Sequence, residues 1–113
     1  MLLPNAALVE IDPQKLHGYL LSKTHPIGRF KARFFAALGY SAERWQEFEA
    51  DLRTQHLTQD AQPADATPDG QVFTIRAILK GPNGRSAAVL SVWFVAAAGG
   101  APRFVTAYPG GAR

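Results

Sequence analysis

Hydrophobic and polar positions change their period near Gly70, and this change divides the chain into two parts. Before Gly70, apolar residues recur three and four positions apart, as in amphipathic helices; after it, they alternate, as in half-buried strands. The pattern predicts an α+β fold, with N-terminal helices packed on one face of a three- to four-stranded antiparallel sheet. A chain of 113 residues has the size of one domain. We expect a single domain over 1–113, with a helical part at 1–58, a mobile loop at 59–70 and the sheet at 71–109.

Three helices are expected in the first part. Asp12-Pro13 predicts a helix start, with Asp as N-cap and Pro at the first helical position, and this helix runs to about residue 22. A second helix over about 29–38 follows the break imposed by Pro26 and ends at Gly39, a residue suited to a left-handed stop. A third begins after an N-cap at Ser41 and ends near residue 56. The spacing predicts that the second helix buries Phe30, Phe34 and Leu38.

Three strands are expected in the second part. Residues 59–70, QDAQPADATPDG, hold no large apolar side chain and predict the loop. Alternation then predicts strands over 71–80, 85–96 and 103–108, and Gly81-Pro82-Asn83-Gly84 predicts a hairpin turn between the first two. One sheet face is expected to stay open to solvent. We expect it to carry Thr74, Arg76, Ser91, Trp93, Thr106 and Tyr108.

The charges are segregated along the chain, which changes the functional expectation. Residues 1–42 carry a net charge of +3, residues 43–69 carry −5, and residues 70–113 carry +5 with no carboxylate. Two basic segments that meet in the fold would attract a polyanion, and we expect the partner to be RNA. The simpler alternative is that these cations only keep the protein soluble.

Composition excludes several kinds of chemistry. The chain has no cysteine, which excludes disulfides, thiolate zinc sites and a cysteine nucleophile, and this fits a cytoplasmic protein. No carboxylate cluster or histidine pair has the spacing of metal ligands, so we expect no metal and no cofactor. No apolar run approaches the ~20 residues of a membrane span, so we expect no membrane partner.

The stretch from Thr24 to Tyr40 concentrates the candidate chemistry. His25 precedes a helix whose first turn carries Arg29 and Lys31. Free N–H groups at a helix start attract anions, and nearby cations strengthen that attraction. An imidazole is the usual side chain for proton transfer near neutral pH. The stretch is therefore either an anion or phosphate site or, equally, the solvated basic edge of an amphipathic helix.

Four motifs, in order along the chain, resemble a known family. LLPNA, THPIGRFKARFFAALGY, GPNGRSA followed by VW, and PRFVTAYP are similar to a bacterial family of small domains of unknown function, family 6883. The resemblance covers nearly the whole chain. It implies no established activity, but members resemble proteins encoded near toxin–antitoxin and polymorphic-toxin genes.

A weaker resemblance is to the barnase/RelE-like RNA-cutting toxins, which place helices before an antiparallel sheet. His25, Lys31, and Thr106 with Tyr108-Pro109 match the outline of their sites, but the predicted sheet lacks the carboxylate that would serve as base.

These observations lead to two functional hypotheses. The first is a metal-independent, toxin-type endoribonuclease in which a ribose 2′-hydroxyl attacks the adjacent phosphate, with a cognate antitoxin or immunity protein as partner. The second is a non-catalytic binding module: an antitoxin, an immunity protein or a toxin-associated adaptor. Convergence of the candidate catalytic residues in one cleft would favour the enzyme. The candidate catalytic residues are His25, Lys31, Thr106 and Tyr108, and the candidate phosphate- or RNA-binding residues are Arg29, Arg76, Arg85 and Trp93.

Overall fold

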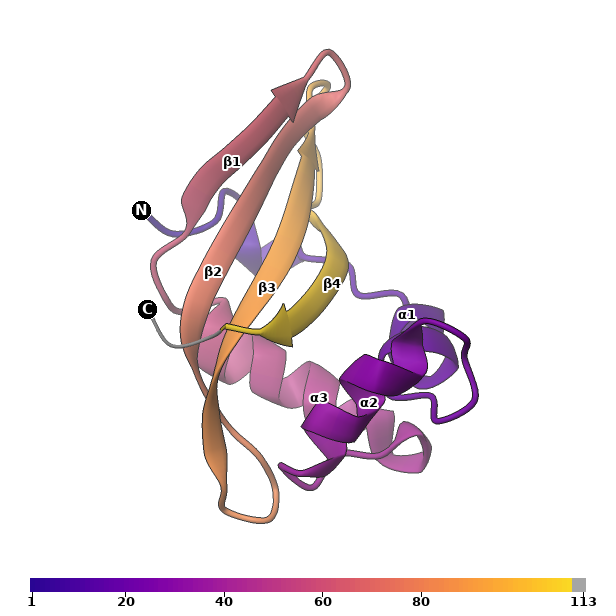
Figure 1. Ribbon diagram of the computed structural model, residues 1–113. Helices are drawn as coiled ribbons and strands as arrows, with labels where there is room; N and C mark the ends of the chain where they lie inside the picture. The colour runs from indigo at the N-terminus through magenta and orange to yellow at the C-terminus, as the bar shows by residue number, and fades with distance from the viewer. Residues whose placement is uncertain (111–113) are drawn as a thin grey trace.

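The computed structural model describes residues 1–110, which form a four-stranded antiparallel sheet with helices against one face (Figure 1). The strands lie in the order β1-β2-β3-β4. This arrangement confirms the predicted α+β class. The strands are β1 (Gln62–Thr67), β2 (Gly70–Lys80), β3 (Ser86–Ala96) and β4 (Arg103–Pro109). The helices are α1 (Pro13–Lys15), α2 (Gly28–Ala36) and α3 (Trp45–Asp51), with the short helical turns η1 (Ala6–Leu8), η2 (Leu16–Leu20), η3 (Ala42–Arg44) and η4 (Leu52–His56).

The helix boundaries follow the predicted start and stop signals in most places. Asp12 caps α1 by accepting a hydrogen bond from the backbone N–H of Gln14 at 2.9 Å. Gly39 has a φ of 99°, the left-handed conformation expected after α2. Ser41 occupies the predicted N-cap position, at the start of η3, but its side chain makes no capping hydrogen bond.

The buried face of α2 differs from the prediction. Phe35 is fully buried, Phe34 is half-buried, and Phe30 is 61% exposed, so the prediction that Phe30 lies in the core is wrong. The contact face is instead marked by the small residues Gly28 and Ala32, which are both buried. A side chain at Gly28 would collide with the backbone carbonyl of Tyr19, so α2 approaches η2 closely only because residue 28 is glycine.

The hairpin between β2 and β3 has the predicted turn. The N–H of Gly84 donates to the carbonyl of Gly81 at 3.0 Å, and Gly84 has a φ of 89°. Within the predicted loop at 59–70, however, Gln62–Thr67 form the edge strand β1, so that part of the loop prediction is wrong. All six β1 side chains are exposed, which explains why no apolar signal marked the strand.

Two residues predicted on the open sheet face lie in the core. Trp93 and Ser91 are fully buried, and the indole N–H of Trp93 donates to the Ser91 hydroxyl at 2.9 Å. That hydroxyl also contacts Nδ1 of the buried His56, at 2.7 Å, from η4. The open face carries the other parity, and it includes Thr74, Arg76, Leu90, Val92, Thr106 and Tyr108.

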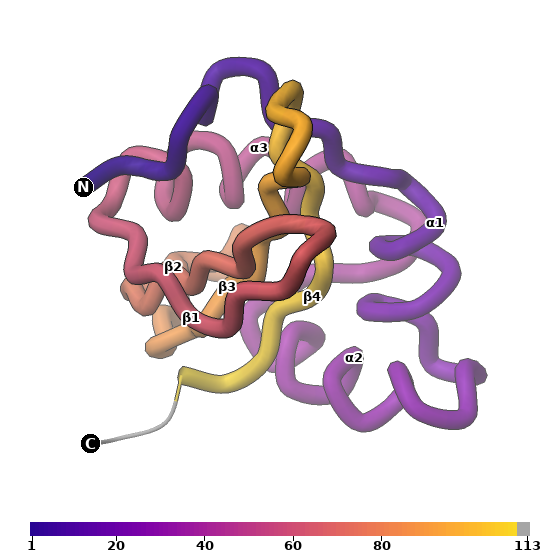
Figure 2. The backbone as a smooth tube through the Cα atoms, turned by 90° about the horizontal axis from the view of Figure 1, so that it is seen from above, coloured from indigo at the N-terminus to yellow at the C-terminus, as the bar shows by residue number. Residues whose placement is uncertain are grey.

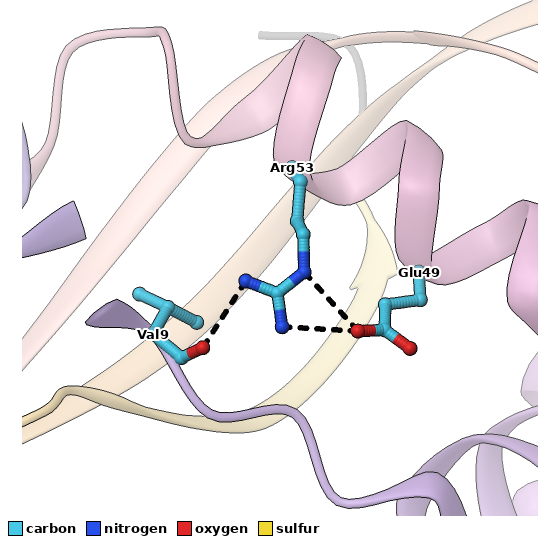
Figure 3. Close-up of polar contacts among 3 residues, drawn as sticks. All are labelled: Val9, Glu49 and Arg53. Atoms are coloured by element: carbon cyan, nitrogen blue, oxygen red, sulfur yellow. Dashed lines mark hydrogen bonds and ion pairs between the residues drawn. The ribbon is translucent and has the colours of Figure 1, made fainter. Parts of the chain in front are cut away.

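The N-terminal segment is tied to both layers (Figures 1 and 2). Arg53 of η4 donates to the carbonyl of Val9 at 3.1 Å and pairs with Glu49 of α3 at 2.9 Å (Figure 3). The next residue, Glu10, forms a short parallel bridge with Arg103 at the start of β4. These contacts fix the chain beside the edge of β4. None of the helices in residues 1–110 combines the length and apolarity that crossing a membrane would require.

Candidate functional site

The ammonium group of Lys31 is the centre of a polar cluster between α2 and β4. Its Nζ donates to the hydroxyl of Tyr19 at 3.1 Å and to the hydroxyl of Thr106 at 3.2 Å. The same Nζ lies 5.3 Å from the ring centre of Tyr19 and 5.6 Å from that of Tyr108. We call Tyr19, Lys31, Thr106 and Tyr108 the Lys31 cluster. Three separate elements, η2, α2 and β4, therefore converge on one half-buried cation.

The Lys31 cluster opens into a hollow of about 460 Å³, lined in part by Tyr19, Lys31 and Thr106. Each hydroxyl oxygen accepts a hydrogen bond from the ammonium, so the hydroxyl hydrogens of Tyr19 and Thr106 are free for other acceptors. Three donors that surround one hollow suit an anion with several oxygens, such as a phosphodiester.

His25 lies beside the Lys31 cluster but serves the backbone. Its ring packs edge-on against that of Tyr19, with the centres 4.9 Å apart. Its Nδ1 accepts hydrogen bonds from the N–H groups of Ile27 and Gly28, both at 3.0 Å. With the bond from the N–H of Arg29 to the His25 carbonyl at 3.1 Å, they close the turn that leads into α2, whose N-cap residue is Ile27. His25 therefore stabilises the turn that leads into α2, the helix that carries Lys31.

The capping bonds restrict what the His25 imidazole can do. Because Nδ1 accepts two N–H groups, the proton of the neutral ring is on Nε2. A general base would need a lone pair on Nε2, and a general acid would need the doubly protonated ring. Either form carries a proton on Nδ1, which would face the N–H groups of Ile27 and Gly28. The geometry thus favours His25 as a cap and neutral donor over the proton-transfer role suggested by the sequence.

The four residues predicted to bind phosphate or RNA do not gather at the Lys31 cluster. Arg76 lies on the open face, where it pairs across β2 and β3 with Leu90, which in turn pairs with Tyr108 on β4. At the usual strand spacing, the backbone of Arg76 is therefore about 10 Å from that of Tyr108. Arg29 turns to another side of α2, where its guanidinium lies 4.7 Å from the ring centre of Phe30. Arg85 lies in the β2–β3 turn, beyond the paired strands and remote from the cluster.

Trp93, the predicted stacking platform, is fully buried and cannot reach a ligand in this conformation. Sequence reasoning missed Tyr19, and it also missed Lys15, whose Nζ donates to the carbonyl of Val105 at 3.4 Å. Tyrosine in an otherwise apolar helix stripe was an available signal, because a buried phenol needs a hydrogen-bond partner. Within residues 1–110, no group of three His, Asp or Glu side chains gathers where it could hold a metal ion.

Comparison with known proteins gives a family but no function. Neither the curated proteins nor the solved structures include a match to this chain. A family model matches residues 2–111, nearly the whole chain. The motif of His25, Lys31 and Gly28 and the strand that carries Thr106 and Tyr108 both lie inside the matched region. The chain therefore belongs to the family described as "Domain of unknown function (DUF6883)".

Proposed function

We propose that the Lys31 cluster binds the scissile phosphodiester of RNA in a metal-independent endoribonuclease of toxin type. The observation that carries this proposal is the ammonium of Lys31, held by hydroxyls from η2 and β4 at the mouth of a hollow. Three of the four residues expected to be catalytic meet there, and the fourth, His25, packs against Tyr19. The Arg76 side chain extends the positive surface over the open face.

The reaction follows from this arrangement. The ribose 2′-oxygen forms a bond to phosphorus while the bond from phosphorus to the 5′-oxygen breaks, which leaves a 2′,3′-cyclic phosphate. The proton of the 2′-hydroxyl passes to water, and the ammonium of Lys31 donates a proton to the departing 5′-oxygen and regains one from water. Lys31, Tyr19 and Thr106 donate hydrogen bonds to the phosphate oxygens, whose charge increases in the transition state. Nε2–H of His25 is a further neutral donor.

The direct test is RNA cleavage by the purified, folded protein. We expect products with 2′,3′-cyclic phosphate ends, slowed growth of bacteria that express the protein without a partner, and RNA binding that weakens as salt rises. Binding is measured at two salt concentrations, and RNA ends are analysed across pH 5–9. Intact RNA over that whole range would contradict the proposal.

A comparison of two His25 variants separates capping from catalysis. His25→Asn keeps an oxygen that can accept from the N–H groups of Ile27 and Gly28, whereas His25→Ala removes the cap and is expected to cost about 1 kcal/mol of stability. We expect His25→Asn to melt near the wild-type temperature and to retain cleavage within about tenfold. Positioned proton transfer is typically worth about 10²–10⁴-fold. A loss of cleavage rate of that size in folded His25→Asn would show that His25 takes part in proton transfer.

A second candidate function rests on a different observation. Ile27, the N-cap residue of α2, and Phe30, which precedes Lys31 in α2, are 64% and 61% exposed. Aromatic, apolar and arginine side chains on one surface are typical of protein interfaces. We therefore keep a non-catalytic module that binds a partner protein, such as an antitoxin, immunity protein or adaptor, as the alternative. A folded protein that leaves RNA intact would favour it.

A further inference from the structure

A second hollow adjoins the Lys31 cluster along β4, and its chemistry differs. Its volume is about 840 Å³, within the range of small-molecule sites, and it shares Lys15 and Val105 with the hollow at Lys31. Val105 is followed directly by Thr106, so the two hollows form one groove. Residue 103 at the far end lies about 10 Å from residue 106, at the usual rise of a strand. That span suits the reach from the phosphate of a nucleotide to its own base.

The floor of this second hollow is apolar and aromatic. Val72 of β2 and Phe94 of β3 are cross-strand partners on the open face, and both side chains are half-buried. The tip of the Phe94 ring lies where a side chain at residue 70 would be, so Gly70 leaves the space that the ring occupies. A half-buried aromatic ring at the base of a groove is a surface on which a nucleobase can pack.

The rim of the second hollow carries charges of both signs, side by side. Glu10 and Arg103 are the two residues of the parallel bridge, and both side chains are exposed. In the part of the chain that the structure describes, they form no ion pair with each other. The guanidinium of Arg103 lies over the Phe94 ring, 5.7 Å from its centre. The backbone of Glu10 is held by bonds to Pro102 and Phe104 at 2.9 and 3.0 Å, which fixes its position beside the groove.

The carboxylates indicate what this end of the groove binds. Glu10 and Asp12 both line it and would repel a phosphate, in contrast to the cationic end at Lys31. Carboxylate oxygens accept hydrogen bonds from base N–H groups, and arginine donates in pairs to O6 and N7 of guanine. Guanine is the base that also offers two adjacent donors, N1–H and N2–H, to the two oxygens of one carboxylate.

We propose that this hollow, floored by Val72 and Phe94 and rimmed by Glu10 and Arg103, binds a guanine base of single-stranded RNA. The inference rests on the proposed function, because it assigns the phosphate of the same nucleotide to Lys31. The Glu10 carboxylate accepts hydrogen bonds from N1–H and N2–H of the guanine, and Arg103 donates to O6. The guanine ring packs against Phe94. Duplex RNA cannot enter, because base pairing covers the Watson–Crick edge of the guanine and stacking covers its faces.

The test is binding of the four nucleoside 3′-monophosphates to the full chain, measured by calorimetric titration. Guanosine 3′-monophosphate is expected to bind at least tenfold more tightly than those of adenosine, cytidine and uridine. Glu10→Gln is expected to reduce this preference about 5- to 150-fold, the worth of one good bidentate contact. Glu43→Gln, the same change at an exposed position of η3 outside the groove, is the control and should leave the preference unchanged.

Equal binding of the four nucleotides, or a guanosine preference that persists in folded Glu10→Gln, would overturn the base site. Nucleotide binding does not need cleavage, so the two proposals fail separately. A protein that binds guanosine 3′-monophosphate but leaves RNA intact loses the proposed function and keeps the base site. A protein that cuts RNA without preferring guanosine loses the base site and keeps the proposed function.

Discussion

Lys31→Met is expected to lower the rate of RNA cleavage about 10²–10³-fold, the usual effect of removing one donor to a developing oxyanion. Methionine fills nearly the same space as the lysine stem but brings no charge and no donor. Tyr19 and Thr106 then lose the ammonium that holds their hydroxyls 3.1 and 3.2 Å away. Because the ammonium acts mainly on the transition state, kcat should fall far more than KM rises.

The matched control is Lys23→Met. Lys23 is exposed in the loop before α2 and makes no hydrogen bond or ion pair among residues 1–110, so this variant removes the same charge without touching the Lys31 cluster. It should cut RNA at close to the wild-type rate. Both variants are checked by circular dichroism and thermal melting. Equal rates for folded Lys31→Met and Lys23→Met would show that Lys31 contributes only bulk charge.

The sequence was sufficient for the class of fold because the period change at Gly70 is a physical consequence of two kinds of backbone. It was insufficient to predict which face of β3 is buried, because Val89, Ser91 and Trp93 are about as apolar as the alternate residues Leu90, Val92 and Phe94. Hairpin register would have resolved this. With the turn at 81–85, the inward Phe73 pairs with Trp93, and Ile75 pairs with Ser91. Ser91 belongs in the core because it satisfies the indole N–H of Trp93.

The α2 helix shows a second limit. Phe30, Phe34 and Phe35 offer two overlapping stripes, and apolarity alone cannot choose between them. The choice is made by Gly28 and Ala32, whose small size allows close approach to η2. The same close approach sets Tyr19 beside Lys31. In α2, small residues one turn apart therefore mark the buried face better than the large residues do.

Part of the candidate site was predictable and part was not. Lys31, Thr106 and Tyr108 were identified with the help of a resemblance to RNA-cutting toxins, but their partner Tyr19 lies 12 positions before Lys31, in η2. Glu10 and Arg103 lie side by side because the N-terminal segment forms a bridge with β4. The two residues are 93 positions apart in the sequence. No local pattern encodes such a contact. It follows from packing, including the Arg53 bond to Val9 (Figure 3).

The buried His56 makes the stability of the fold depend on pH. Its side chain is fully buried, and burial lowers the pKa of the imidazole from 6.5 to about 4, while the nearby backbone of Ala77 acts more weakly in the opposite direction. The folded state therefore binds the proton less readily than the unfolded state. Stability is fully present above pH 6.5 and is lost as pH falls from 6.5 toward 4.

We expect the free energy of unfolding to decrease by about 3 kcal/mol over that pH window, as a pKa shift of this size implies. A small domain has about 5–15 kcal/mol in total, so the loss is a large fraction. The Ser91 hydroxyl that contacts the ring and the nearby backbone of Ala77 are both uncharged and do not offset it. Asp60 acts at lower pH: its hydrogen bond from the N-terminal ammonium lowers the pKa of that carboxyl, so its contribution is lost only near and below pH 4.

The measurement is urea unfolding of wild type, His56→Asn and His17→Asn at steps between pH 7 and pH 4. Asparagine at residue 56 can still accept from the Ser91 hydroxyl but does not titrate in this range. We expect His56→Asn to be about 1–3 kcal/mol less stable at pH 7, because the smaller side chain leaves a cavity, yet to show a nearly flat profile down to pH 4.5. His17 is only half-buried, against Trp45, and its variant should keep the wild-type slope. A wild-type profile that is flat from pH 7 to 4.5, or a His56→Asn profile as steep as wild type, would show that another group causes the acid sensitivity.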